Sequence, residues 1–278
     1  MKNAEGLMRG VFAASAFAAI LSLVLICLFL VVNGLPAVFK IGAGSLLLGR
    51  EWTPADSPAA FGILPMILGS VYVTVGAVLL GAPIGIFTAV FMAFYCPKRA
   101  YKLLKPALDL LAGIPSIIYG FFGLVLLVPL IRSLFGGSGF SLLSASIILG
   151  IMILPTIIGI AEASLRAVPQ TSFENAIALG AGKERSIFAA VFPAAKKGVI
   201  AGVVLGIGRA IGETMAVIMV AGNQARMPDG VLKGVRTLTA NIVLEMGYAA
   251  DVHREALFAT ALILLAFILI INIVIYVL

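Results

Sequence analysis

Residues 198–222 read GVIAGVVLGIGRAIGETMAVIMVAG, a stretch long and apolar enough to cross a lipid bilayer. Its only ionisable side chains are Arg209 and Glu213. Each costs about 2.5–3.5 kcal/mol at a bilayer centre on insertion scales, so such residues face a protein interior or a water-filled path. On a continuous helix, a spacing of four residues places both on one face. The stretch therefore predicts a membrane span with a polar path along it.

The glycines of this stretch are spaced in a way that favours close packing. Gly198, Gly202 and Gly206 recur every four residues and predict a flat stripe that another helix can approach closely. Gly208 and Gly212 flank Arg209 and leave room beside the charges for a ligand or a neighbouring backbone.

The composition of the whole chain is that of a membrane protein. The chain is 62% hydrophobic and 11% charged, with a mean hydropathy of +1.18, so we expect membrane lipid around it. Its net charge of +7 comes from basic residues clustered between apolar stretches, which indicates membrane topology and no nucleic-acid partner. Two cysteines and one histidine supply neither a disulfide framework nor a metal site.

Six stretches reach the length of about 20 residues that a membrane-spanning helix needs. They predict an all-α polytopic membrane protein with spans at residues 11–32, 63–95, 107–131, 143–165, 199–222 and 256–278. Pro83 predicts a kink in the long second span. The first span has a longer apolar core than a cleaved signal peptide, so we expect it to be retained. We divide the chain into residues 1–62, an N-terminal span with an outer segment, and a core domain, 63–278.

The distribution of Lys and Arg sets the expected orientation. Segments 1–10, 96–106 and 166–198 hold eleven of these residues, against seven in the longer alternate segments 33–62, 132–142 and 223–255. The positive-inside rule therefore places both termini in the cytoplasm of a multi-pass protein. The last span ends at Leu278 without the charged residues that commonly anchor a span on that side.

The longest of the expected cytoplasmic segments, 166–198, is predicted to be structured. Thr171 and Glu174 match a capping box, which predicts a short helix that ends at Gly180. A second short helix is expected from Lys183 and should stop before Pro193. From these features alone, the segment is either an amphipathic loop on the lipid headgroups or a docking protrusion.

The residues of this segment resemble the EAA loop of ABC importer permeases. The pattern runs Glu174-Asn175-Ala176-x-x-x-Gly180 and continues to Phe192-Pro193. Asn175 replaces the second residue of the motif, and Ala190 and Phe192 stand where Ile and Leu are usual. The resemblance implies that the segment is a coupling loop that docks into a cleft on a cytoplasmic ATPase. It implies coupling roles for four residues: Glu174, Ala176, Gly180 and Pro193.

No phosphate-binding loop accompanies this motif. Residues 180–183 read GAGK, but a Walker A motif needs Gly where Ile177 stands and Ser or Thr where Glu184 stands. The chain is therefore expected to be a transport subunit and not an enzyme, with no cofactor of its own and with ATP bound by a partner ATPase.

The fifth span resembles the signature of phosphate ABC importer permeases of the PstC type. The similarity lies in residues 208–217, GRAIGETMAV, and continues to Asn223. It extends over roughly residues 50–278 and includes AGIPS at 112–116 and LPT at 154–156. It implies the type I ABC importer permease fold, in a bacterial inner membrane, as half of a pore for inorganic phosphate. The implied partners are a second permease of the PstA type, an ATPase dimer and a periplasmic or lipid-anchored phosphate-binding protein.

Five residues are candidates for the substrate pathway: Arg209, Glu213, Thr214, Asn223 and Ser116. Guanidinium donates in a planar fork that suits phosphate oxygens. A carboxylate nearby can compete for the arginine and so release the anion. The alternative is that the two charges form an ion pair that braces two helices.

Other polar residues are expected to play lesser parts. Asp109 and Glu162 lie near cytoplasmic span ends and are expected to snorkel or to pack against the coupling loop. Segment 223–255 is expected to contain a short lateral helix that meets the binding protein, with His253 solvated there.

Two rival functions remain at this level. One is a permease for another oxyanion, namely tungstate, molybdate or sulfate. The other is a secondary transporter driven by protons through Glu213, although the hydropathy pattern shows no inverted repeat.

Overall fold

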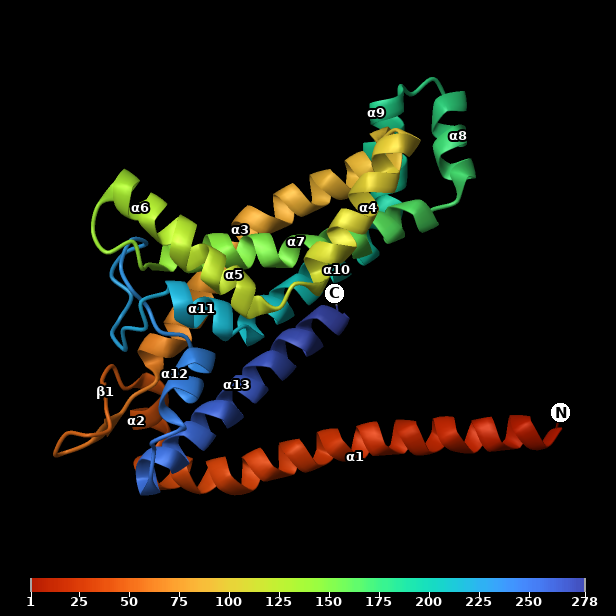
Figure 1. Ribbon diagram of the computed structural model, residues 1–278. Helices are drawn as coiled ribbons and strands as arrows, with labels where there is room; N and C mark the ends of the chain where they lie inside the picture. Colours follow the sequence, from red (N-terminus) through yellow and green to blue (C-terminus); the bar gives the residue numbers. More distant parts are fainter. Residues whose placement is uncertain (1, 278) are drawn as a thin grey trace.

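The computed structural model describes residues 2–277 and the side chains of residues 8–273. Met1 and Leu278, the two termini that the sequence places in the cytoplasm, lie outside the described residues. Within that part, six helices are long and apolar enough to cross a membrane, which confirms the predicted number (Figure 1). They are α1 (Lys2–Ile41), α3 with the π-helix η1 (Leu64–Tyr95), the run α5–η2–α6 (Ser116–Phe135), α7 (Leu142–Ala167), the run α9–η3–α10 (Lys183–Gly212) and α13 (Asp251–Val277).

The shorter elements lie at the two ends of these helices. At one end, which we call the loop end, are α4 (Lys98–Gly113), α8 (Gln170–Ala178) and α9 (Lys183–Ser186) (Figure 1). At the other, which we call the hairpin end, are α2 (Ala43–Leu48), the two-stranded antiparallel hairpin of β1 (Trp52–Thr53) and β2 (Ala60–Phe61), and α12 (Leu238–Glu245). The short helix α12 confirms the one expected in segment 223–255.

Two of the predicted span boundaries are wrong. The third span begins at Ser116 and not near 107, because Ile114 and Pro115 are extended and separate α4 from α5. Proline disfavours a helical conformation of the residue before it, which explains the break at Ile114. The fifth span ends as a helix at Gly212, ten residues before the predicted 222. Pro83 lies inside α3, which continues without interruption to Val90.

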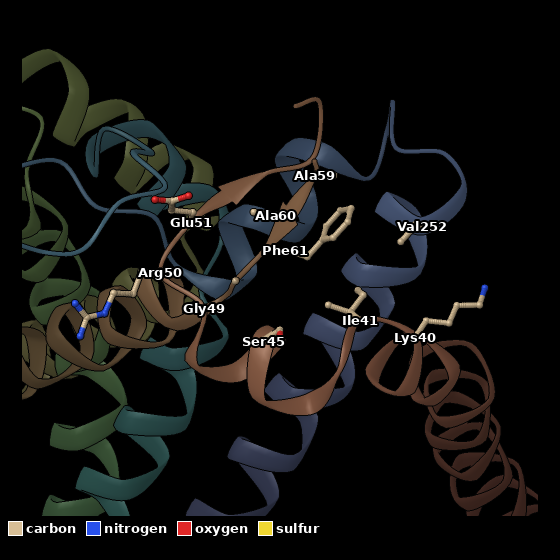
Figure 2. A pocket seen from close by; sticks show the side chains of 11 residues that line it. Lys40, Ile41, Ser45, Gly49, Arg50, Glu51, Ala59, Ala60, Phe61 and Val252 are labelled. Carbon is tan, nitrogen blue, oxygen red and sulfur yellow. The ribbon is translucent and has the colours of Figure 1, made fainter. Parts of the chain in front are cut away.

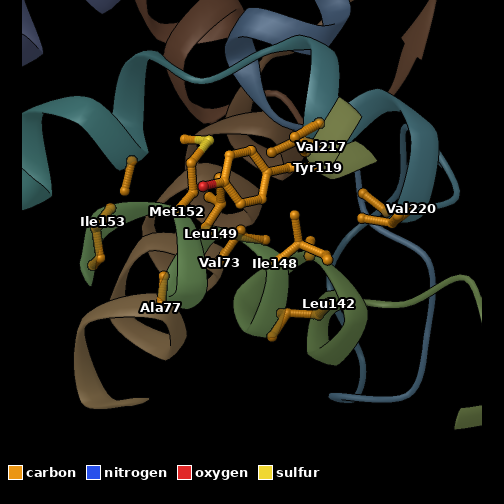
Figure 3. Close-up of a cluster of buried hydrophobic side chains, with 14 of the residues drawn as sticks. Val73, Ala77, Tyr119, Leu142, Ile148, Leu149, Met152, Ile153, Val217 and Val220 are labelled. Carbon is orange, nitrogen blue, oxygen red and sulfur yellow. The ribbon is translucent and has the colours of Figure 1, made fainter. Parts of the chain in front are cut away.

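Helix α7 is the centre of the bundle and packs between α3 and α10. The main cluster of buried apolar side chains is built around its residues Ile148, Leu149, Met152 and Ile153 (Figure 3). Glycines allow the close approach on both sides. A Cβ on Gly81 of α3 would lie 2.8 Å from the carbonyl oxygen of Gly150 in α7.

The glycine stripe predicted for the fifth span does pack closely against another helix, and that helix is α7. A Cβ on Gly198 would meet the Ser164 side chain, and one on Gly206 would lie 3.0 Å from Ile157 Cγ1. The three glycines therefore let α10 approach α7 at a distance that larger residues would not allow.

The first helix joins the bundle only near its C-terminal end. Gly34 packs against α13, where its Cβ would lie 2.8 Å from the carbonyl oxygen of Phe258. Towards its N-terminus α1 diverges from the other helices (Figure 1). Its apolar side chains from Met8 to Ile26 are exposed around the helix, so this length of α1 presents apolar surface on all sides.

Candidate functional site

The fifth span is broken at the pair of residues that the sequence singles out. Helix α10 ends at Gly212, Glu213 is extended (φ −73°, ψ 134°), and a second helix, α11 (Met215–Val220), begins after Thr214. The expectation that Arg209 and Glu213 share one face of a continuous helix is therefore wrong. The fifth span is instead a discontinuous helix, the kind of element that forms binding sites in many transporters.

Backbone groups freed by this break are satisfied by nearby groups. Glu213 N donates to Ala210 O at 3.3 Å, and Thr214 Oγ1 donates to Gly212 O at 3.4 Å. Glu213 O accepts from Thr239 Oγ1 of α12 at 3.0 Å. Unpaired backbone groups at membrane depth cost several kcal/mol, so these bonds are what makes the break tolerable.

The Glu213 side chain turns towards α11. Its Oε1 accepts from the backbone N–H of Ala216 at 3.2 Å, as an N-cap side chain does. Among the described residues, Arg209 and Glu213 form no ion pair with each other, so they do not brace two helices within this chain.

Arg209 keeps most of its hydrogen-bonding capacity free. It is half-buried, and within the described part of the chain its one hydrogen bond runs from Nη1 to Thr156 Oγ1 of α7, at 3.3 Å. A guanidinium has five N–H donors. Among the described residues, nothing lies within 4 Å of a Cβ placed on either Gly208 or Gly212, so there is open space at the glycines next to the arginine, as predicted. Together these features make Arg209 able to bind an anion.

Thr156 was not singled out as a pathway residue. It follows Pro155 inside α7, and the signals in the sequence are its place in the LPT stretch at 154–156 and a hydroxyl in the middle of an apolar span.

The other candidates lie at three different places. Thr214 lies in the break itself. Ser116 is the first residue of α5, and α5 packs against α11, since a Cβ on Gly120 would lie 2.9 Å from Ala216 Cα. Asn223 lies beyond the far end of α11, where its Nδ2 donates to Ile218 O at 2.8 Å. Arg209, Glu213 and Thr214 thus lie near one another along the chain, at the end of α10 and in the break. Helix α11 lies between them and Asn223.

The coupling loop, residues 166–198, begins differently from the prediction. The N-cap of α8 is Pro169, no side-chain cap bond is formed, and Thr171 lies inside the helix, so the capping box is wrong. Proline presets a backbone angle (φ −55°) suited to a helix start, which moves the start upstream of Thr171. The predicted end is confirmed: Gly180 has φ +87°, and Ala181 N donates to Ala176 O at 3.1 Å in a Schellman-type cap.

The second helix of the loop does not stop before Pro193. Helix α9, the π-helix η3 (Ile187–Val191) and α10 (Phe192–Gly212) follow one another without a gap. Pro193 lies in the first turn of α10, where its missing N–H costs little because the π-helical turn has already shifted the hydrogen-bond register. The loop is therefore continuous with the helix that carries Arg209.

Two large apolar side chains are exposed at the end of α8 in the coupling loop. Leu179 is 90% exposed and Ile177 46%, next to the exposed Glu174. A cavity of about 370 Å³ lies behind α8, between Phe94, Phe173 and Val191.

Two basic residues tie the loop to the end of the second span. Arg166 Nη2 donates to Met92 O at 2.7 Å, and Lys183 Nζ donates to Phe94 O at 3.2 Å. The Lys183 ammonium also lies 4.4 Å from the centre of the Tyr95 ring. Basic side chains on the last carbonyls of a helix are stabilising.

Glu162 is buried and ion-paired with Arg166, the first residue of the coupling loop, so of the two expected placements it packs against the loop and does not snorkel. It is 2% exposed, and its carboxylate accepts from Arg166 Nε at 2.8 Å and from Lys105 Nζ of α4 at 3.3 Å. Beside it, the pKa of the Tyr101 hydroxyl is raised, first by a hydrogen bond to this carboxylate and second by burial. Asp109 is exposed.

A separate cavity of about 710 Å³ opens at the hairpin end (Figure 2). Its lining includes Lys40, Ser45, Arg50, Glu51 and Phe61, and none of the five pathway candidates. Lys40 and Arg50 point away from each other in this view, and Lys40 is paired with Glu255 at 2.7 Å.

Glu245 near the hairpin is a buried acid that the sequence did not reveal. It is 5% exposed, and its carboxylate accepts from Trp52 Nε1 at 2.7 Å, is hydrogen-bonded to His253 Nε2 at 2.8 Å and is ion-paired with Arg236. The expectation that His253 is solvated is therefore wrong. No group of His, Cys, Asp and Glu within the described residues is arranged to hold a metal ion.

Comparison with known families identifies the kind of protein that contains this site. The family model described as binding-protein-dependent transport system inner membrane component matches residues 81–278. The chain belongs to this family. It is therefore an inner-membrane, multi-pass permease subunit of an ABC importer, has no catalytic role of its own and requires no cofactor on this chain. Its partners include an ATPase and a binding protein. This membership excludes the proton-driven secondary transporter.

Several curated relatives are similar along most of the permease. The probable ABC transporter permease protein YqgH of Bacillus subtilis (strain 168) is 39% identical over 262 residues, 92% of this chain and 85% of the relative. The phosphate transport system permease protein PstC of Mesorhizobium japonicum is 35% identical over 276 residues, 91% and 84% of the two chains. The probable PstC of Methanocaldococcus jannaschii is 33% identical over 279 residues, 93% and 88%.

Solved structures share the fold of the permease. An inward-facing structure of the MetNI methionine ABC transporter matches with a TM-score of 0.61 and 18% identity, over 77% of this chain and 92% of that one. An amino acid ABC transporter matches with a TM-score of 0.55 and 17% identity, over 76% and 90%. The fold is thus the type I ABC importer permease fold, as predicted.

Proposed function

We propose that this permease forms half of the pore through which an ABC importer moves inorganic phosphate, and that Arg209 binds the anion on the way. The observation that carries the proposal is the half-buried guanidinium of Arg209, which has one bond to a threonine hydroxyl and open space beside it. The similarity to PstC proteins supports phosphate as the anion.

Phosphate at this position would meet donors from two helices. The guanidinium offers paired N–H groups, and the Thr156 hydroxyl on α7, which accepts from Arg209, keeps its own O–H to donate. The Thr214 hydroxyl in the break would donate to the anion after releasing Gly212 O. Glu213 acts in release. Its carboxylate now caps α11 at Ala216 N, and when that bond opens, the carboxylate can compete with phosphate for Arg209.

The remaining parts of the transport cycle come from partner chains. A second permease of the PstA type supplies the other half of the pore, a phosphate-binding protein delivers the anion, and the ATPase dimer draws the coupling loops together when it binds ATP. Glu174, Ala176, Gly180 and Pro193 serve that coupling, since α8 is exposed and the helical run that follows it, α9–η3–α10, carries Arg209. Residues 1–62 form an N-terminal addition to the core domain 63–278, and both termini are cytoplasmic.

Phosphate uptake by the complete complex in proteoliposomes tests this function. We expect Arg209→Gln to abolish uptake and Glu213→Gln to slow it while phosphate still binds. Arg226→Gln is the matched control, because Arg226 is exposed in the loop after α11. Normal uptake and normal ATPase stimulation in both Arg209→Gln and Glu213→Gln would overturn the pathway assignment.

Competition between anions tests the substrate. Unlabelled phosphate should reduce uptake of labelled phosphate at lower concentration than sulfate, molybdate or tungstate does. Stronger competition by one of those oxyanions would reassign the substrate and leave the transport mechanism in place.

A further inference from the structure

We propose that Glu245 is a positioning residue for the substrate path. It fixes Arg236 and α12 at the hairpin end, and these hold the two ends of α11. The inference rests on the proposed function, since it concerns the path that contains Arg209 and Glu213. It adds a residue 32 positions beyond Glu213 along the chain, in a different helix.

The first step is the burial of the Glu245 carboxylate. Three donors from three different elements converge on it: Trp52 from β1, His253 from α13 and Arg236 from the loop before α12. A buried charge is costly unless it is paired and hydrogen-bonded, so this one persists because all three partners are in place.

The second step runs from Arg236 to the far end of α11. Arg236 Nε donates to Asn223 O at 2.9 Å, and its Nη1 also donates to Asn241 Oδ1 at 3.0 Å. Asn223 in turn donates from Nδ2 to Ile218 O inside α11. The ion pair with Glu245 therefore fixes the residue that holds the end of α11.

The third step runs from α12 to the near end of α11. Glu245 is the last residue of α12, and Thr239 in its first turn donates to Glu213 O at the break. The same helix is tied to α3, because Leu238 N donates to Ser70 Oγ at 2.9 Å. Helix α12 therefore fixes the start of α11 relative to α3, and Glu245 fixes α12.

Between these two attachments α11 has only six residues, Met215–Val220. A segment that short has little stability of its own. Its place, and with it the orientation of the Glu213 carboxylate that caps it, depends on what holds its two ends. The Glu245 network holds both.

The network is also incompletely satisfied. Asn223 Oδ1 and Asn241 Nδ2 are buried without a hydrogen-bond partner among the described residues. Both belong to residues that contact Arg236.

The test compares four variants in the complete, reconstituted complex and measures phosphate taken up per ATP hydrolysed. Glu245→Gln removes the charge that fixes Arg236, and Thr239→Val removes the bond to the break at nearly constant volume. We expect both to lower this ratio about threefold or more, a size typical of residues that couple sites.

The matched controls are Thr239→Ser, which keeps the hydroxyl, and Glu255→Gln, which removes a half-buried carboxylate of α13 that pairs with Lys40 outside the Glu245 network. Both should keep the wild-type ratio. A merely structural role would reduce the amount of assembled complex and leave the ratio per complex unchanged. A wild-type ratio in Glu245→Gln and Thr239→Val would therefore overturn the proposal; if Glu245→Gln does not assemble, the Thr239 pair decides.

A second measurement does not depend on the substrate. Amide hydrogen exchange in residues 215–220 of the assembled complex should be faster in Glu245→Gln and Thr239→Val than in the wild type and the two controls. Equal protection in all of them would overturn the proposal. A wild-type complex that takes up another oxyanion and not phosphate would overturn the proposed substrate alone, and the ratio would then be measured with that anion.

Discussion

Arg166 Nη2 donates to the backbone carbonyl of Met92 at 2.7 Å and so joins the end of the fourth span to the π-helical end of the second. The coupling loop starts at this arginine, four residues before α8. In the coupling that we propose, a displacement of α8 by the ATPase would act on α3 as well as on α7 and α10. This bond would make the second span part of the moving unit.

Removal of the Arg166 guanidinium should weaken that transmission. We expect Arg166→Gln to hydrolyse ATP at near the wild-type rate while phosphate uptake falls several-fold, because α3 no longer follows the loop. Parallel measurements of ATPase and uptake in proteoliposomes check this. Arg185→Gln, which changes an exposed cation of α9, should leave both rates unchanged. Equal uptake in the two variants would contradict the prediction.

The end of α8 depends on a glycine in the left-handed conformation. Gly180 has φ +87°, and a side chain there costs roughly 1–2 kcal/mol. We expect Gly180→Ala to loosen the end of α8 and to reduce binding of the ATPase, measured by co-purification. Gly182→Ala serves as the control because Gly182 has φ −67°. Similar ATPase recovery with both alanines would count against this role for Gly180.

Close packing of α3 on α7 should make Gly81 sensitive to any side chain. A methyl group there would lie 2.8 Å from Gly150 O, closer than packed atoms tolerate. Overpacking of this kind costs about 1–3 kcal/mol, so Gly81→Ala should lower the melting temperature of the detergent-solubilised permease. Gly159→Ala, where nothing lies within 4 Å, should not. If both variants melt alike, the helix contact is less close than described.

Loss of the Glu162 carboxylate should destabilise the loop end. Glu162→Gln keeps the volume of the side chain and removes the charge that pairs with Lys105 and Arg166. Both partners are partly exposed and can reach water, so the expected loss is about 1–3 kcal/mol and not the larger cost of an isolated buried charge. Thermal unfolding in detergent measures it. Unchanged stability would mean that the two cations are fully solvated without Glu162.

Features encoded locally could be predicted from the sequence. The six spans follow from runs of apolar residues, the close α10–α7 contact from three glycines spaced by four, and the end of α8 from Gly180. The start of α8 and the course of the chain through Pro193 could not. The start of α8 depends on whether Pro169 or Thr171 opens the helix. The course of the chain at Pro193 depends on whether this proline ends a helix or lies in its first turn, and the π-helical turn η3 allows the second.

The candidate site could be predicted only in part. Arg209 and Glu213 are conspicuous because charge is rare in an apolar span. The break between them is not, because it is stabilised by Thr239, 26 residues further along the chain. The Glu245 cluster is less visible still, since Trp52 and Glu245 are separated by 193 positions. Nothing local in either segment indicates that they meet.

Trp52 is the chain's one tryptophan, so all the indole fluorescence of this subunit comes from this side chain. The ring is buried, its N–H is bound to the Glu245 carboxylate, and the His253 ring lies 6.0 Å away at an edge. The emission wavelength and lifetime of that indole should report, without any attached label, whether the hairpin end is closed around it or has opened.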